Sequence, residues 1–329
     1  MITVIIPTHN RSALLGSSIL SIISYCNNED DLELLIIDNA SDDNTRKISA
    51  ALGSLLPNCR SIYEPTPGLH SGRHRGMQES KGSVLVYLDD DVEITKTWFL
   101  AIRQAFADPD VALLGGNNIP VFYGSTPSWL EDLWEQKLPD GSRCLPWLSI
   151  QEHLEGKKDH DPFMVWGCNF AIRKSVLLAA GGFHPDGMPK HLIRFRGDGE
   201  THVARYVADN KLKCIFDSKA SVFHKVTPER MSLPYFRRRG FNQGISDSYA
   251  FLRNFSASDQ QDKSNTKQKE SSWLKKSLRM VKRRIFPEKI QNPALIEFGL
   301  GFSEGFAYHQ HAYSTDPDVR DWVHKQNYF

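Results

Sequence analysis

The chain has 329 residues, of which 40% are hydrophobic and 11% aromatic. This composition is ordinary for a globular protein with a buried core, and it excludes a chain that is disordered throughout. The five cysteines form no Cys-x-x-Cys pair, which argues against a disulfide framework or a zinc knuckle and favours a reducing, cytoplasmic setting. We expect neither a signal peptide nor a membrane-spanning helix, because no apolar run is long enough.

The net charge of +1 hides an asymmetry along the chain. Between positions 235 and 289, fourteen Lys or Arg residues stand against five Asp or Glu residues, so the remainder of the chain is acidic. A basic region of this kind is typical of contact with nucleic acid, an anionic membrane or a phosphorylated substrate, and charge alone does not choose among these partners.

The first hundred residues predict a βαβαβαβ pattern. Apolar runs at 2–6, 32–38, 61–63 and 84–88 alternate with amphipathic stretches at 12–25, 44–56 and 71–80. Runs that are apolar at nearly every position indicate strands buried on both faces, hence a mainly parallel sheet with helices on both sides.

Polar clusters follow three of these strands. They are Pro7-Thr8-His9-Asn10, Asp38-Asn39 and Asp89-Asp90-Asp91. The carboxyl ends of strands line the ligand crevice of an open parallel sheet, so we expect the three clusters to converge. Adjacent carboxylates repel one another, and a cation that bridges phosphates is the usual reason for such a triplet. Alternation along an extended backbone lets Asp89 and Asp91 share one task while Asp90 turns aside.

Further elements are predicted beyond residue 95. We expect a helix at 97–108, a strand at 111–114, long surface loops to about residue 147, a strand and helix within 163–183, a helix ending near 209 and two strands within 212–224. Residues 256–272 are polar and predict a flexible linker, and 294–329 predict a helix packed back on the domain.

Seven segments carry a family resemblance in their order and spacing. They are PTHNR at 7–11, IIDNASDDNT at 36–45, PGLHSGRHRGM at 67–77, VYLDDDV at 86–92, GCNFAIRKSVLLAAGGF at 167–183, GDGETHVARYVADN at 197–210 and ASVFH at 220–224. Over about residues 1–225 the chain resembles the family 2 glycosyltransferases. The resemblance implies an α/β fold of the GT-A type with a mainly parallel central sheet, and transfer of a sugar from a nucleoside diphosphate with inversion and with bound Mn²⁺ or Mg²⁺.

The expected domains are a GT-A-like domain at 1–255, with a nucleotide-binding half at 1–115 and an acceptor half at 116–255, the linker at 256–272, and a helical C-terminal extension at 273–329. The resemblance assigns Asp38 to the nucleobase, Asp89 to the ribose and Asp91 to the cation. The expected nucleotide-binding set is Pro7, Thr8, Asn10, Arg11, Asp38, Arg73, Asp89 and Asp90.

Alternatives remain for these assignments. Asp38 can instead stabilise a turn or a helix end, and Arg73 can be a solvated side chain. His224 stands where the family frequently has a second metal ligand, although a lone histidine is more often a packed or exposed residue.

The catalytic base departs from the family pattern. The family has an acidic pair at the start of a helix, whereas this sequence has Gly197-Asp198-Gly199-Glu200, so the family's second acid falls on Gly199. A base must accept the proton of the acceptor hydroxyl, and either Asp198 or Glu200 can do so. Asp198 is our preferred candidate, with a helix-capping role as its alternative.

The C-terminal third contains two basic motifs. Arg237-Arg238-Arg239 can contact the donor diphosphate or a phosphorylated acceptor, with a solvated helix face as the favoured alternative. Residues 273–286 predict a basic amphipathic helix that either lies on an anionic membrane or docks on its own protein.

The leading hypothesis is an inverting, metal-dependent glycosyltransferase of glycan assembly, with a UDP-sugar as donor and a saccharide or lipid-linked acceptor. We expect it in the cytoplasm or peripherally on the inner face of the membrane, with no nucleic-acid partner. A sugar-phosphate nucleotidyltransferase and a non-catalytic nucleotide-sugar-binding protein are the alternatives. The first of these is expected to have a Gly-rich basic loop after the first strand, which PTHNR does not provide.

Overall fold

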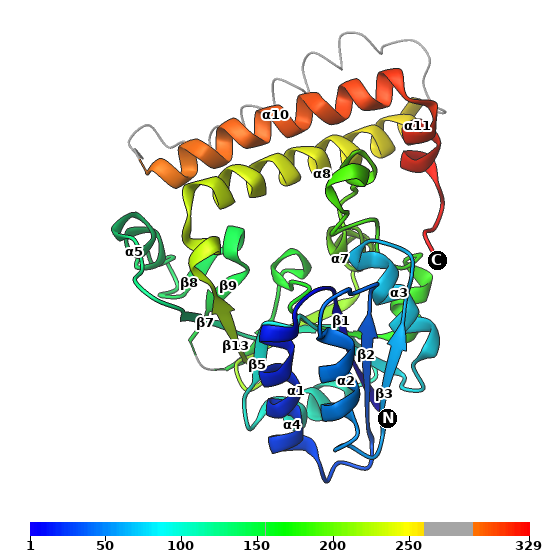
Figure 1. Cartoon of the computed structure of the whole chain (residues 1–329), viewed down its shortest axis with the longest axis vertical. Helices are drawn as coiled ribbons and strands as arrows, with labels where there is room; N and C mark the ends of the chain where they lie inside the picture. The colour runs from blue at the N-terminus through cyan, green and yellow to red at the C-terminus, as the bar shows by residue number, and fades with distance from the viewer. Residues whose placement is uncertain (155, 260–291) are drawn as a thin grey trace.

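The computed structural model describes residues 1–154, 156–259 and 292–329. Within these ranges the strands form two sheets (Figure 1). The larger sheet has eight strands in the order β10-β12-β6-β11-β4-β1-β2-β3. Their bounds are β1 Ile2–Thr8, β2 Leu32–Asp38, β3 Cys59–Tyr63, β4 Val84–Leu88, β6 Val111–Gly115, β10 Lys157–Asp159, β11 Asn169–Arg173 and β12 Lys213–Asp217.

The half of this sheet built from β1 to β4 is parallel, as the sequence predicts. Strand β1 pairs in parallel with both β2 and β4, and β2 pairs in parallel with β3. Strand β11 runs antiparallel to β4 and β6, which makes the whole sheet mixed. All residues of β1, β2 and β4 are buried, which agrees with their continuous apolar runs.

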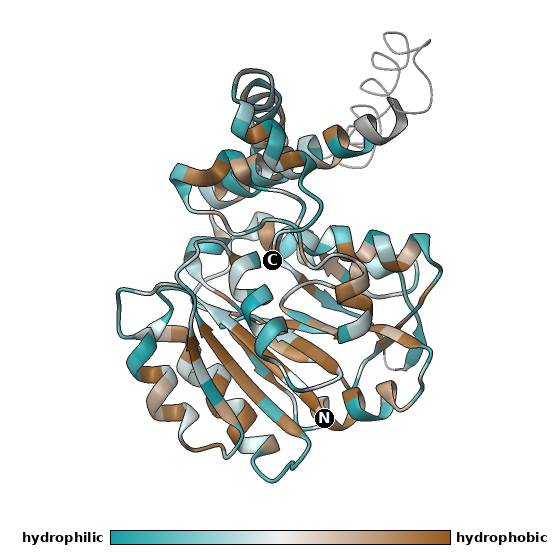
Figure 2. Ribbon diagram, turned by 90° about the vertical axis from the view of Figure 1, so that its right-hand side faces the viewer, coloured by the Kyte–Doolittle hydropathy of each residue, from teal (hydrophilic) through white to brown (hydrophobic). Residues whose placement is uncertain are grey.

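Helices cover both faces of the larger sheet. One apolar core lies under α1 (Ser12–Cys26), α2 (Thr45–Gly53) and α4 (Trp98–Phe106). The second core lies under α3 (Leu69–Glu79), α6 (Lys174–Ala179) and α7 (Glu200–Asp209). Figure 2 shows the apolar strands enclosed between these layers. The fold is therefore the predicted α/β arrangement of a central sheet between helices.

The segment predicted as surface loops up to residue 147 is instead largely regular, and that expectation is wrong. It contributes strands to the second sheet, of order β5-β13-β7-β9-β8, and a helix. The bounds are β5 Val92–Ile94, β7 Asn118–Phe122, α5 Ser128–Trp134, β8 Arg143–Leu145, β9 Ile150–Glu152 and β13 Val222–Val226. Its aromatic residues pack into a third core, with Trp129 and Trp147 against Phe236, because the C-terminal helices supply the opposing surface.

Two long helices lie above the sheets. Helices α8 (Leu233–Asp259) and α10 (Pro293–Thr315) run side by side, and α11 (Pro317–His324) turns back toward the domain (Figure 1). The expected packing of the C-terminal region onto the domain is thus present. Helix α8 reaches residue 259, so the first four positions of the predicted linker are helical. The remainder of that linker and the basic amphipathic segment 273–286 lie outside the described residues.

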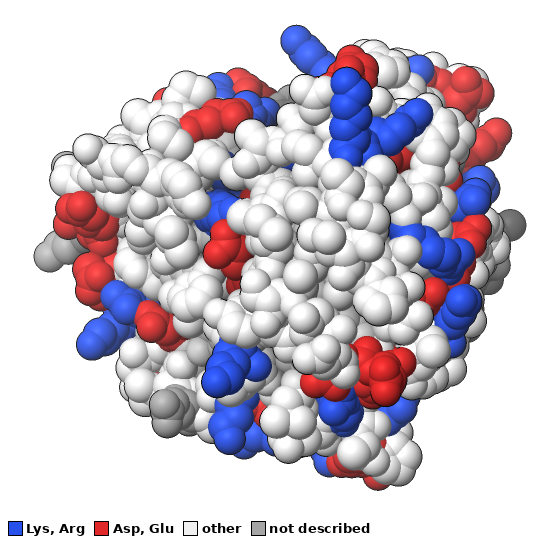
Figure 3. Space-filling view, turned by 60° about the horizontal axis from the view of Figure 1, so that its bottom comes forward, with Lys and Arg blue, Asp and Glu red and all other residues white. Residues whose placement is uncertain are grey.

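The face of the molecule in Figure 3 carries both signs of charge. Acidic and basic side chains are scattered over it and do not form a large patch of one sign. In the described part of the chain, no helix is at once long enough and apolar enough to cross a membrane.

Candidate active site

The polar clusters that follow β1, β2 and β4 converge at one edge of the larger sheet, as the sequence predicts. They line a first cavity of about 520 Å³. The lining residues are Pro7, Thr8, His9, Arg11, Asn39, Ala40, Pro67, Gly68, Leu69, Asp89, Asp90, Asp91, Gly187, Pro189 and His191. The convergence follows from topology, because parallel neighbours end at the same edge of a sheet.

A second cavity of about 290 Å³ adjoins the first and shares Arg11, Leu69, Asp89 and Asp91 with it. Its other lining residues are Arg73, Ser149, Gly167, Cys168, Asp186, Glu200, Thr227, Glu229, Arg230, Tyr235, Arg238 and Arg239. A molecule in either cavity therefore meets Asp89 and Asp91 at the boundary. The two cavities therefore meet at these two carboxylates.

The three aspartates behave differently, as backbone alternation predicts. Asp89 and Asp91 line both cavities, whereas Asp90 lines only the first. The Oγ1 hydroxyl of Thr8 donates to Oδ2 of Asp90 at 2.7 Å, and Arg11 lies 3.6 Å from the same carboxyl group. Burial and the neighbouring charge of Asp91 raise the pKa of Asp90 to about 8. Asp90 therefore attaches the loop that follows β4 to strand β1.

Asp91 meets two residues that are remote in sequence. Its Oδ1 atom lies 3.4 Å from Nε2 of His224 in β13, and its Oδ2 atom lies 3.2 Å from the Arg230 guanidinium. Burial alone raises a carboxyl pKa, but the positive charge of the adjacent Arg230 favours the ionised form of Asp91. Asp91 is therefore an anion within a nearly closed part of the site.

The hydrogen bonds of His224 define its tautomer. Arg230 can only donate, and its guanidinium lies 2.8 Å from Nε2, so Nε2 accepts and the ring proton resides on Nδ1. Nδ1 donates to the carbonyl oxygen of Ser149 at 3.1 Å. The Ser149 carbonyl at one nitrogen and Arg230 at the other thus fix the orientation of the ring, and Nε2 can bind a metal ion only where the Arg230 guanidinium moves aside.

The donor atoms at this point fit a divalent cation. Oδ1 of Asp91 is buried and has no hydrogen-bond partner among the described residues. It lies 3.4 Å from Nε2 of His224, the nitrogen that Arg230 also contacts, and carboxylate with imidazole is a ligand set that Mn²⁺ accepts. Across the described ranges no three His, Cys, Asp or Glu residues cluster closely enough to hold a metal ion. The remaining ligands of such a cation would be oxygens of substrate or water.

Glu200 lies in the second cavity at the first position of α7. Its Oε2 atom accepts from Arg73 at 3.2 Å, and its Oε1 atom accepts from the amide of Gly167 at 3.2 Å. Gly199 precedes it with φ of 55°, a left-handed conformation that favours glycine and turns the chain into the helix. Each carboxylate oxygen keeps a free lone pair for a further donor.

Asp198, our preferred base from the sequence, lines neither cavity. Its Oδ1 atom is 2.6 Å from Nδ1 of His184, and its Oδ2 atom accepts from Arg205 at 3.1 Å. Its side chain does not cap α7 either. The physical reason is the turn at Gly199, which sends the two flanking side chains in different directions. Asp198 anchors the start of α7 to the underlying protein.

Of the predicted nucleotide-binding residues, Arg73 lines only the second cavity, and Asp38 and Asn10 lie beside the first cavity without lining it. Asp38 is 1% exposed, and its carboxylate accepts from the Ser41 amide and from Arg46. It therefore makes the turn-stabilising bond that its alternative interpretation anticipates. Asn10 has φ of 54°, and its side chain accepts from the amide of Asp42. Their contacts with a nucleotide stay predictions.

Sequence reasoning missed several residues of the site. Arg230, Asp186 and the segment at 187–191 line the cavities but were not singled out. No local pattern marks them, because each follows an irregular stretch and reaches the site only through tertiary packing. Arg238 and Arg239, for which a solvated helix face was the favoured interpretation, line the second cavity, and Arg238 is exposed as that interpretation predicts.

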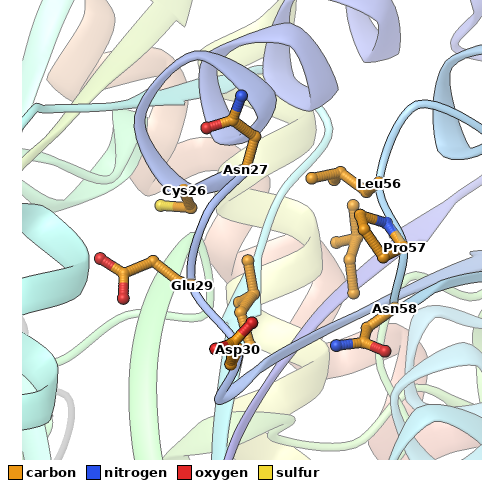
Figure 4. Close-up of a pocket in the computed structure, with 9 residues that line it drawn as sticks. Cys26, Asn27, Glu29, Asp30, Leu56, Pro57 and Asn58 are labelled. Carbon is orange, nitrogen blue, oxygen red and sulfur yellow. The ribbon is translucent and has the colours of Figure 1, made fainter.

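A third cavity lies at the opposite edge of the larger sheet. Figure 4 shows Cys26, Asn27 and Glu29, at and after the end of α1, on one side of this cavity and Leu56 and Pro57 on the other. Its volume of about 50 Å³ holds about one or two water molecules. Burial raises the pKa of the Cys26 thiol to about 12, so the thiol is not a nucleophile at neutral pH. We assign no site to this cavity.

The central sheet between helices, with C-terminal helices above it, defines a class of protein by its fold, the α/β proteins of GT-A architecture. The family model "Glycosyl transferase family 2" matches residues 3–179, more than half of the chain. The chain therefore belongs to glycosyl transferase family 2, and it is a glycosyltransferase rather than a sugar-phosphate nucleotidyltransferase or a non-catalytic binding protein.

Two curated relatives come from Haloferax volcanii. Glycosyltransferase AglE is 26% identical over 117 residues, which are 35% of this chain and 38% of that protein. Glucosyl-dolichyl phosphate glucuronosyltransferase is 20% identical over 229 residues, 69% of this chain and 70% of that protein. The chain thus spans little more than a third of the first relative's length.

Two solved structures share the fold. The mannosyltransferase PcManGT from Pyrobaculum calidifontis, in complex with GDP-Man and Mn²⁺, has a TM-score of 0.52 and 16% identity, and the match covers 99% of this chain and 83% of that one. GalNAc-T7 with UDP, GalNAc and Mn²⁺ has a TM-score of 0.51 and 16% identity, with 77% and 50% covered. At this identity the likeness shows the fold alone.

Proposed function

We propose that this glycosyltransferase is inverting and metal-dependent, and that it moves a sugar from a nucleoside diphosphate, a UDP-sugar, to a saccharide or lipid-linked acceptor. One observation carries the proposal. Asp91, paired with His224, stands at the boundary of two cavities, and the second cavity contains the carboxylate of Glu200. A leaving diphosphate and a base for the acceptor thus have separate positions on either side of the reacting carbon.

The first cavity takes the nucleotide in this proposal. The nucleobase and ribose lie beside Thr8, Asn39 and Asp89, and the diphosphate reaches Asp91. Asp91 and His224 would hold Mn²⁺ or Mg²⁺, and that cation would neutralise the charge of the departing diphosphate. Both solved neighbours hold Mn²⁺ with a nucleotide or nucleotide sugar, one GDP-Man and the other UDP, which supports this class of donor.

The acceptor enters the second cavity. Glu200 takes the proton from the acceptor hydroxyl, and the oxygen attacks the anomeric carbon from the face opposite the diphosphate, which inverts the centre. Arg73 and the Gly167 amide orient the carboxylate without using all of its lone pairs. Asp198 acts as a positioning residue, because its bonds to His184 and Arg205 fix the start of α7.

The Glu200 assignment is tested by Glu200→Gln, with Asp198→Asn as the competing candidate and Glu29→Gln at the opposite edge of the sheet as matched control. We expect Glu200→Gln to lower the transfer rate by about a hundredfold or more while nucleotide affinity persists, because only proton transfer is lost. Full activity in Glu200→Gln, combined with a large loss in Asp198→Asn, would reverse the assignment.

The metal is tested by chelation and re-addition. We expect EDTA to abolish transfer and added Mn²⁺ or Mg²⁺ to restore it, and we expect Asp91→Asn to remain inactive with either ion. Calorimetric titration of UDP and of GDP, each with and without Mn²⁺, identifies the nucleotide. Activity that survives EDTA and Asp91→Asn would remove the metal from the proposal.

A further inference from the structure

Three consecutive arginines near the start of α8 divide between two surfaces. Arg237 pairs with Glu297 and Glu304 of α10, on the side away from the site. Successive residues on a helix differ in direction by about 100°, and Arg238 and Arg239 line the second cavity instead. Figure 1 shows α8 passing between α10 and the rest of the molecule, which brings this part of the helix over the site.

The carboxylates that line the second cavity are already paired. Glu200 and Asp89 lie beside Arg73, and Asp91 lies beside Arg230. Glu229 accepts from Arg238, and Asp186 pairs with Arg196 at 2.6 Å. Of the remaining arginines in the lining, Arg11 lies beside Asp90. Each of these negative charges therefore has a positive neighbour other than Arg239.

Arg239 is the exception. Within residues 1–154, 156–259 and 292–329 its side chain makes no hydrogen bond or ion pair, and its Nε atom is buried. A buried guanidinium N–H without an acceptor is costly, so an acceptor from outside the described chain is expected. Its charge reaches the cavity, because it acts with Arg196 and Arg73 to hold the pKa of Asp186 below its ordinary value against the effect of burial.

We propose that Arg239, assisted by Arg238, binds a phosphate group carried by the acceptor. The inference rests on the proposed function, in which the second cavity receives the acceptor. The planar guanidinium fork matches phosphate oxygens, and a phosphate supplies the acceptors that Arg239 lacks. Neither arginine lines the first cavity, where the nucleotide lies, which favours the acceptor over the donor diphosphate as their partner. The substrate class is a phosphorylated acceptor, either a lipid phosphate or a soluble sugar phosphate.

The test uses the full chain saturated with UDP or GDP and Mn²⁺, so that the donor diphosphate site is filled. Calorimetry then measures the binding of inorganic phosphate, octyl phosphate and uncharged octyl glucoside. We expect both phosphates to bind. We expect Arg239→Gln to weaken both by about tenfold or more, since a charge-assisted hydrogen bond is lost. Arg237→Gln is the matched control, with the same charge change two residues earlier in α8, and it should bind as the wild type does.

The outcomes separate this proposal from the proposed function. Tighter binding of octyl phosphate than of inorganic phosphate identifies a lipid-linked acceptor, and equal binding identifies a soluble one. Equal phosphate affinity in Arg239→Gln and wild type overturns the subsite. A weakened affinity for UDP or GDP in Arg239→Gln, with nucleoside binding intact, also overturns it by assigning Arg239 to the donor. Failure of the wild type to bind any nucleotide refutes the proposed function, while phosphate binding can still be measured.

Discussion

The crossing of α8 and α10 makes a quantitative prediction about stability. Four glycines let the two helices touch backbone to backbone. A methyl group at Gly240 would lie 2.0 Å from the carbonyl oxygen of Phe298, and one at Gly305 would lie 1.9 Å from that of Phe241. Gly244 and Gly301 are equally tight, at 2.1 Å from carbonyl oxygens of the partner helix. Ordinary contacts begin near 3.4 Å, so the helices must separate by more than 1 Å to accept an alanine.

The expected effect of Gly240→Ala is the balance of two opposite contributions. Alanine in a helix is intrinsically favoured over glycine by about 1 kcal/mol. Forced insertion of a methyl group into packed backbone costs about 1–3 kcal/mol and can exceed that where carbonyl oxygens cannot move aside. We therefore expect Gly240→Ala or Gly305→Ala to lower the free energy of unfolding by about 1–2 kcal/mol. The double variant should lose less than the sum, because the first substitution already separates the helices.

The matched control is Gly16→Ala in α1. Its nearest neighbours are Leu52 and Ile48 side chains at 3.7 Å and 3.9 Å, which is ordinary contact. We expect this variant to raise the free energy of unfolding by about 0.5–1 kcal/mol, because only the higher helix propensity of alanine contributes. Urea unfolding at pH 7.5 measures the wild type and these four variants. Phosphate affinity is the second readout, because Arg238 and Arg239 directly precede Gly240. If Gly240→Ala is stabilised as much as Gly16→Ala, the inferred helix crossing is wrong.

Three further predictions concern the donor, pH and the membrane. Asp38→Asn should raise the KM for the donor by about tenfold with little change in kcat, because a contact remote from the reacting bond stabilises the ground state and the transition state equally. Unchanged donor affinity would exclude Asp38 from the nucleotide site. Acid should destabilise the fold between about pH 6.5 and pH 4, because burial lowers the pKa of His74 to about 3 and of four other histidines to about 4, namely His70, His160, His202 and His309. As the pH falls, these histidines take up protons in the unfolded chain before they do so in the folded protein. Each of them therefore lowers the free energy of unfolding by up to about 1.4 kcal/mol per pH unit. A free energy of unfolding that stays constant in urea titrations across this range would contradict their burial as neutral side chains. The segment 273–286 should bind anionic liposomes in a salt-sensitive way, and Leu278→Glu with Val281→Glu should abolish co-sedimentation; equal sedimentation with neutral vesicles would favour docking on the protein instead.

Much of the first cavity follows from local sequence. Strands β1, β2 and β4 are continuous apolar runs, and parallel pairing brings the residues after them to one edge whatever the rest of the fold does. Thr8, Arg11 and Asp89 to Asp91 could therefore be named in advance as lining residues. The alternation that separates Asp90 from its neighbours is likewise a property of extended backbone.

Regular structure between residues 116 and 147 could not be predicted in this way. Its strands are short, and β7 exists because it pairs with β13, about a hundred residues later. Its aromatic residues resemble those of an exposed loop until α8 and α10 cover them. Short strands have little propensity of their own, and their pairing is decided by distant partners.

The sequence by itself determined the α/β layering, the family and the acidic edge at which β1, β2 and β4 end, since these depend on runs of neighbouring residues. Tertiary structure decided the chemistry around that edge. It brought Arg230 and His224 to Asp91, turned Glu200 into the second cavity and Asp198 away from it, and set Arg239 over the same space. Each of these outcomes depends on a side-chain direction or a contact between residues far apart in the chain. The turn at Gly199 separates its two neighbours, because it directs the carboxylate of Glu200 toward the second cavity and leaves that of Asp198 in the protein interior.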